Sequence, residues 1–137
     1  MKRLKFLMAV CFFLVCALPA AANVIDISGP WILEFPQGQG LAVMQNIGGQ
    51  PPTYQGQVTL PYPDDSGRLI FNVKMLSDPS YLTPGNNITF QPTTYPGIGF
   101  FMMNLSSGSS GIAWIIPNAG SNNNILKFYD LRAPAHR

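Results

Sequence analysis

The chain has 137 residues, with few charged side chains, one histidine and two cysteines. This length accommodates one domain with a real hydrophobic core, but not two. The small number of charges excludes the basic surface that nucleic-acid binding needs.

Residues 1–22 have the pattern of a secretory signal peptide. A positively charged head precedes an uncharged apolar run at 6–18, and small residues at 20–22 follow it. The run is short for a membrane span, which needs about 20 apolar residues. We therefore expect cleavage before Asn23, an exported protein, and a periplasmic or extracellular location.

Both cysteines lie within this segment, so the mature chain is expected to have neither disulfide nor thiolate chemistry. Lipidation of Cys16 or Cys11 remains an alternative, although a valine precedes each of them. Removing three of the eight Lys and Arg residues leaves five against six Asp and Glu residues, a net charge of −1. The single histidine, His136, stands near the end of the chain, which disfavours a histidine-dependent triad or metal site.

The mature chain, a single predicted domain at 23–137, reads as short strands separated by Gly, Pro, Asn and Ser. Residues 29–35 predict the first strand, since Trp31, Leu33 and Phe35 alternate with less apolar residues. Pro30 lacks a backbone donor and suits the start of a strand.

The next strand is expected at 41–47, with Leu41, Val43 and Ile47 facing inward and Gln45 pointing with them. The third is expected at 53–60, and three of its side chains alternate on an inward face. These are Tyr54, Val58 and Leu60.

Residues 68–75 give the cleanest alternation of the chain. Its inward face is predicted to hold Leu69, Phe71, Val73 and Met75. Short strands are also expected at 87–90, 97–105, 112–116 and 124–131, and the residues from Arg132 onward are expected to form a tail.

About eight strands with short connections predict antiparallel pairing between sequence neighbours. An open sheet of this size would leave two edges unpaired and one face wet, and closure removes both problems. We therefore predict an all-β fold, an antiparallel meander closed as a small barrel, with a β-sandwich as the alternative.

The Gly29-Pro30-Trp31 triplet, the strand meander and Arg132 after the predicted last strand together resemble the calycins, the group of lipocalins and avidin-like barrels. In that group a tryptophan closes one end of the barrel and a basic side chain lies across it. The resemblance implies that Trp31 and Arg132 form this closing pair, an arrangement that is physically favourable by about 1 kcal/mol.

No pattern of catalytic, cofactor-binding or metal-binding residues is found. Asp64 and Asp65 lie together in a turn-like stretch, but they lack the regular ligand spacing of a known calcium loop. The glycines at 38–40 and 48–49 have no lysine after them and read as hairpin turns. We expect a protein that is not an enzyme and has neither cofactor nor metal.

Binding is the function that the composition favours. The stretches 97–105 and 112–116 are apolar on both faces, so one face lines an interior and the other is covered or available to a partner. The first hypothesis is a small hydrophobic or amphipathic ligand in the barrel. The residues expected to contact it are Gln45, Tyr54, Phe71, Phe100, Met102 and Trp114. The alternative is a protein-interaction module, with a partner or a second copy bound through 97–105 or a sheet edge.

Overall fold

We describe the fold from a computed structural model that places residues 24–61, 68–76, 78, 80–95, 97–118 and 132–137. The expected signal segment 1–22, the Asp64–Asp65 turn and the strand expected at 124–131 lie outside these residues. No helix among the described residues has the length and apolar character of a membrane span.

The structure is an all-β barrel closed by eight antiparallel strands, each paired with its neighbours in sequence. The strands are β1 (Gly29–Phe35), β2 (Gly38–Gly48), β3 (Thr53–Pro61), β4 (Arg68–Met75), β5 (Asn87–Pro92), β6 (Ile98–Leu105), β7 (Ser110–Pro117) and β8 (Arg132–His136). Pairing of β8 with β1 closes the barrel. The predicted meander and its closure are confirmed, and the sandwich alternative is wrong.

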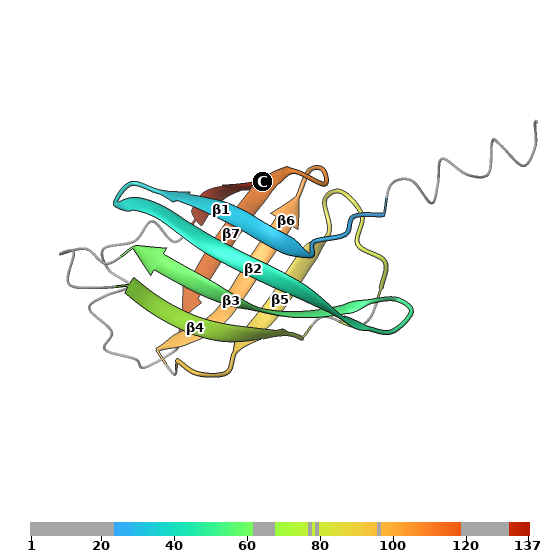
Figure 1. Ribbon diagram of the computed structural model, residues 1–137, viewed down its shortest axis with the longest axis horizontal. Helices are drawn as coiled ribbons and strands as arrows, with labels where there is room; N and C mark the ends of the chain where they lie inside the picture. Colours follow the sequence, from blue (N-terminus) through green and yellow to red (C-terminus); the bar gives the residue numbers. More distant parts are fainter. Residues whose placement is uncertain (1–23, 62–67, 77, 79, 96, 119–131) are drawn as a thin grey trace, which may run out of the picture.

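Strands β1 to β4 form the near wall of the barrel in Figure 1, and β5 to β7 form the far wall. The outer faces of β2–β4 and of β6–β7 therefore look in opposite directions. Residues 24–28 and the turn between β6 and β7 lie at one end of the barrel, and the turn between β1 and β2 lies at the other.

The core fills the barrel with apolar side chains, and no polar or charged residue is buried among the described residues. The predicted inward faces of β1, β3 and β4 are confirmed by the alternation of buried and exposed residues. The largest side chains that are almost completely buried are Trp31, Tyr54, Phe71, Phe90 and Phe101.

The predicted register of β2 is wrong by one residue. Ala42 and Met44 face the interior, whereas Leu41, Val43 and Ile47 are exposed on the outside. The cause is the pairing with β1, which sets Trp31 against Ala42, Leu33 against Gly40 and Phe35 against Gly38. Small residues on β2 leave room for the large inward side chains of β1, so the apolar residues between them turn outward.

The expected tail is also wrong, because Arg132–His136 is strand β8. It pairs with β7 from Ser110↔His136 to Trp114↔Arg132 and with β1 through Leu33↔Ala135. Ala133 and Ala135 are buried and face the core. Their small side chains give no alternation of large apolar residues from which a strand could be predicted. A strand at this position removes the two free edges that β1 and β7 would otherwise have.

Candidate binding surfaces

One end of the barrel is closed around Trp31. Its side chain is completely buried, and its indole nitrogen donates a hydrogen bond to the carbonyl oxygen of Ile27 at 3.0 Å. The guanidinium of Arg137 lies over the indole ring, 4.5 Å from its centre. The expected partner, Arg132, instead lies over Trp114 on the outer surface, 5.6 Å from that ring. The assignment of Arg132 to barrel closure is therefore wrong.

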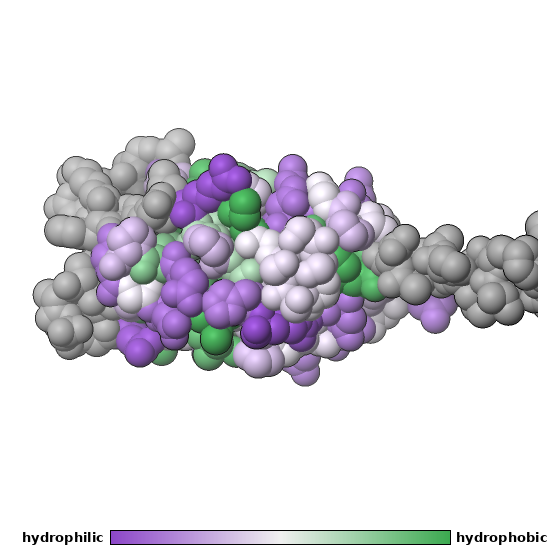
Figure 2. Space-filling view, turned by 90° about the horizontal axis from the view of Figure 1, so that it is seen from above, coloured by the Kyte–Doolittle hydropathy of each residue, from purple (hydrophilic) through white to green (hydrophobic). Residues whose placement is uncertain are grey.

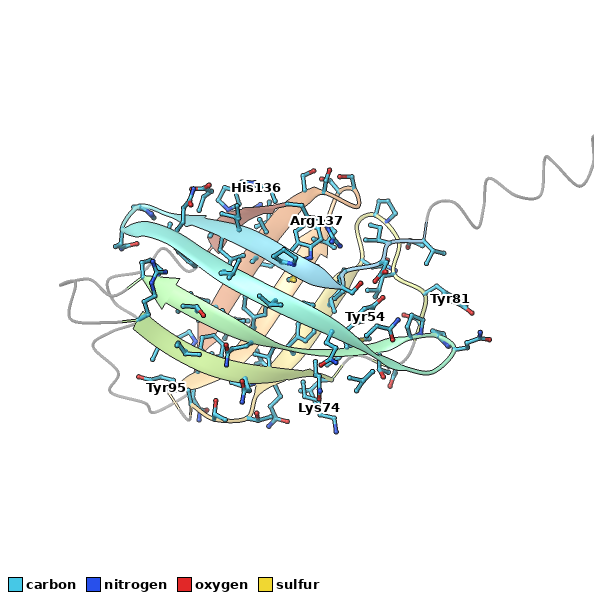
Figure 3. All side chains as sticks on the ribbon, viewed as in Figure 1. Tyr54, Lys74, Tyr81, Tyr95, His136 and Arg137 are labelled. Atoms are coloured by element: carbon cyan, nitrogen blue, oxygen red, sulfur yellow. The ribbon has the colours of Figure 1, made fainter. Side chains whose placement is uncertain are left out.

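Arg137 reaches Trp31 because β8 extends through His136 and carries the next residue to the closed end. Its side chain donates hydrogen bonds to the carbonyl oxygens of Asp26 and of Ser28, the latter at 2.6 Å, and to that of Gly108 at 2.9 Å. It thus joins residues 24–28 to the turn between β6 and β7. Figure 3 shows Arg137 and Tyr54 toward this end of the barrel.

Tyr54 completes the closed end from β3. Its hydroxyl donates to the Asp26 carboxylate, with 3.1 Å between the two oxygens. Burial, and then the neighbouring Asp26 charge, raise the pKa of Tyr54 above its usual value. The backbone N–H of Ser28 donates to the carboxylate of Asp26 and lowers the pKa of Asp26, against a smaller effect of burial. Both shifts keep Tyr54 a donor and Asp26 an acceptor, which is the protonation state this contact needs.

The structure divides the predicted ligand-contacting residues between two sides of the barrel wall. Tyr54 and Phe71 face the interior and are almost completely buried. The remaining four have outward side chains. They are Gln45, Phe100, Met102 and Trp114. A single interior site formed by all six residues is therefore excluded, and the inward orientation expected for Gln45 is wrong.

Strands β6 and β7 carry an apolar group on their outer faces, which we call the outer apolar cluster. It consists of Phe100, Met102, Trp114 and Ile116. Phe100 pairs directly with Ile116, and Met102 pairs with Trp114. Phe100 and Ile116 are 41% and 39% exposed, so two large apolar residues paired across neighbouring strands are left partly open to solvent.

An irregularity in β6 determines which residues form this cluster. The register shifts between Ile98 and Phe100, so Ile98 is buried on the same side as Phe101 and Met103. Without the shift, strict alternation would place Ile98 outside with Phe100. The sequence predicted two apolar faces for 97–105, and the structure shows that Phe101 lies on the inner one.

Titratable side chains meet at the outer seam between β1 and β8. His136 Nε2 lies 2.9 Å from Glu34 Oε1, and both side chains are partly exposed. The hydrogen bond to Glu34 raises the pKa of His136 above 6.5. No three His, Cys, Asp or Glu side chains in the described part of the chain lie close enough to share a metal ion.

Comparisons with family models, curated proteins and solved structures gave no match for this chain.

Sequence reasoning missed two of the residues that define these surfaces. Arg137 lies in the segment predicted to be a tail. It could be placed beside Trp31 only by recognising residues 132–136 as a strand. Ile116 was counted with an apolar stretch, but its exposure depends on the pairing with Phe100.

Proposed function

We propose that the protein is a non-catalytic interaction module that contacts another protein through the outer apolar cluster. The supporting observation is the direct pairing of Phe100 with Ile116 on an outer wall, with both side chains well exposed. Leaving such a surface in water forfeits about 25 cal/mol for each Å² of apolar area. A protein partner, including a second copy of this chain, would recover that free energy.

The rest of the cluster suits such a contact. Met102 and Trp114, the next outward pair on the same two strands, add a flexible thioether and a broad ring beside the more exposed pair. Aromatic residues, methionine and arginine are the side chains enriched at protein interfaces. Arg132, stacked on Trp114, borders the cluster with a positive charge.

The decisive experiment places a photo-crosslinking amino acid at Phe100 in the protein expressed in its own host. We expect cross-links to one defined partner, or to a second copy, which disappear when Ile116→Asp is added. The same crosslinker at Ile70, a residue on the opposite wall that is 52% exposed, is the matched control. Equal cross-linking from both positions, or none from Phe100, would contradict the proposal.

We also propose that the barrel is calycin-like. The closed meander of eight strands and the arginine stacked on a buried tryptophan at one end support this relationship. In this interpretation Arg137 takes the role that the sequence resemblance gave to Arg132. An experimentally solved structure would test the calycin-like proposal. It should show the strands winding in the direction found in calycin barrels, with Arg137 packed over Trp31 at the closed end.

A second candidate function is the binding of a small apolar ligand at the end of the barrel opposite the closed one. Phe35 and Leu69 are inward apolar residues near that end and are 7% and 8% exposed. Native mass spectrometry of the protein purified from its source would show the bound mass. A ligand-free spectrum in gentle conditions would count against this candidate.

Export is part of the proposal and rests on the pattern of residues 1–22. A mature protein that starts at Asn23 is expected in the periplasm or outside the cell. N-terminal sequencing of the exported form measures this directly. Finding an acylated Cys16 at the mature N-terminus would contradict cleavage before Asn23 and would show that the protein is anchored by a lipid.

A further inference from the structure

The near wall of the barrel carries a second surface, unlike the outer apolar cluster in chemistry. A hollow of about 790 Å³ lies against β2, β3 and β4. The polar side chains that line it, which we call the amide groove, are Gln45, Gln55, Gln57, Asn72, Lys74 and Thr93. The hollow also borders Val43, Met44, Gly56 and Val73.

Gly56 borders the hollow, and its position between the outward Gln55 and Gln57 directs its missing side chain toward the barrel interior. A Cβ atom added there would lie 2.3 Å from the carbonyl oxygen of Val43 and 2.7 Å from the sulfur of Met44. The backbones of β2 and β3 therefore approach each other more closely than any larger residue would allow. Because glycine has no side chain, Gly56 contributes only main chain to the lining of the hollow.

Strand pairing arranges the amides in adjacent positions. Gln45 is directly opposite Gln55, which is opposite Lys74 on the next strand. Antiparallel partners on one face have Cβ atoms about 4.5–5.5 Å apart, close enough to contact one ligand together.

The second row of the groove is held in place by hydrogen bonds. Gln57 is opposite Asn72 and donates from its amide nitrogen to the Asn72 side-chain oxygen at 3.3 Å. The backbone N–H of Thr93 donates to the Asn72 carbonyl oxygen at 2.8 Å, which fixes the segment after β5 beside this row. The groove is thus built from three strands and the segment after a fourth.

The chemistry of this lining defines the ligand that fits. A primary amide offers both donors and an acceptor, as does a hydroxyl group, so a row of amides matches a molecule with many hydroxyls. Among the described residues that line the groove, Lys74 is the only charged side chain and none carries a carboxylate. Figure 3 shows Lys74 at the margin of β4, projecting away from the barrel. A strongly charged ligand is therefore not favoured.

The volume of the hollow and the pairing of the strands beneath it further restrict the class of ligand that can bind. The hollow falls within the roughly 300–1,000 Å³ that small-molecule sites usually occupy. An added peptide strand needs free backbone groups at a sheet edge. At the groove β3 is paired on both sides, with β2 and with β4, so recognition there depends on side chains.

We propose that the amide groove binds an uncharged, hydroxyl-rich chain of two or three sugar rings. The amides of Gln45, Gln55, Gln57 and Asn72 contact its hydroxyl groups. The proposal is independent of the outer apolar cluster, because the two surfaces lie on opposite walls of the barrel (Figure 1).

The test is titration of the full exported chain with three trisaccharides: maltotriose, cellotriose and tri-N-acetylchitotriose. The readout is the NMR signals of the side-chain NH₂ groups, which report each glutamine and asparagine separately. At least one trisaccharide is expected to shift the groove amides at concentrations up to about 10 mM, which detects even weak affinity.

Two variants decide whether the groove is the site. A Gln45→Ala/Gln55→Ala double variant is expected to weaken binding at least tenfold, whereas Gln37→Ala, an exposed amide in the β1–β2 turn, leaves it unchanged. If the double variant folds poorly, Asn72→Asp gives a second check. It keeps the shape of the side chain but removes its amide donor, so it is also expected to weaken trisaccharide binding.

Three results would overturn the proposal. The first is that no trisaccharide shifts the groove signals. The second is that the shifts persist in the double variant and in Asn72→Asp. The third is that an uncharged hexapeptide shifts these signals while all three sugars leave them unmoved, which would make the groove a peptide site.

Discussion

Trp31 and Trp114 occupy opposite kinds of environment, although each has an arginine over its ring. Trp31 is fully buried and donates to the backbone of Ile27, whereas Trp114 lies on the outer face of β7. The tryptophan that matters for stability should be the buried one.

Replacing Trp31 by alanine removes a large core side chain and leaves a cavity. We expect the free energy of unfolding to fall by about 3–5 kcal/mol. Urea denaturation measures it, and Trp114→Ala serves as the control with a clearly smaller loss. Equal losses would mean that Trp31 does not support the core.

Arg137 should contribute more to stability than Arg132, which had been the expected closing residue. Arg137→Gln removes a cation over a buried ring and hydrogen bonds to three carbonyl oxygens. Because the arginine itself is exposed, we expect a loss of only about 1–2 kcal/mol. Arg132→Gln is the matched control in the same thermal unfolding experiment, and a larger effect there would restore the original assignment.

The contact of His136 with Glu34 should make the stability of the β1–β8 seam depend on pH. The pKa of His136 is raised in the folded protein by its hydrogen bond to Glu34. A raised histidine pKa adds stability that is complete below the unfolded value of about 6.5 and is lost as the pH rises through the folded pKa. The stabilising effect therefore belongs to mildly acidic solution.

Thermal unfolding of the wild type and of Glu34→Gln at pH 5.5 and pH 8.5 tests this dependence. The difference between the two proteins should be larger at the lower pH. A difference that grows with pH would show that the contact does not favour protonated His136.

At the scale of the element, alternation predicted β1, β3 and β4 well because the large apolar residues of each strand are concentrated on its inward face. It failed for β2, where the outward face carries Leu41, Val43 and Ile47 and the inward positions opposite Leu33 and Trp31 are the small Gly40 and Ala42. Gly40 and Ala42 look like a poor core face until the rings of β1 are set against them. The register depends on both strands of a pair, so it cannot be predicted from the sequence of one strand alone.

At position 56 the backbone of β2 limits the size of the residue that β3 can carry. Gly56→Ala would put a methyl group against the backbone of Val43, which has little room to move within a paired strand. We expect destabilisation of about 1–3 kcal/mol, the usual range for overpacking. Gly108→Ala, where a Cβ meets nothing within 4 Å, is the control in chemical denaturation. Similar midpoints for the two variants would show that β2 and β3 are not closely packed there.

At the scale of the whole molecule, closure could be predicted, with a sandwich as the alternative, because an open sheet of about eight short strands would leave two edges unpaired. The position of the closing strand could not, since Ala, Pro and Ala between two charged residues lack the usual strand composition. The site residues were harder still. Whether Phe100 or Phe101 faces out depends on the irregularity in β6, which alternation does not reveal.

The face of the molecule shown in Figure 2 combines hydrophilic areas with separate hydrophobic ones. Deleting residues 133–137 should convert this surface into one with two unpaired strand edges. We expect the truncated protein to lose its cooperative thermal transition or to aggregate, because β1 and β7 lose their partner. Circular dichroism and light scattering measure both. A truncated protein that melts like the full chain would show that β8 is dispensable.

The bond between Arg137 and the carbonyl oxygen of Ser28 spans 109 residues of sequence. Contacts of such long range slow folding, because the entropy of closing a large loop must be lost before the contact forms. A chain in which β8 has not yet paired with β1 and β7 therefore lacks the contacts that close its barrel. We expect closure to come late in folding, after the local pairing of neighbouring strands.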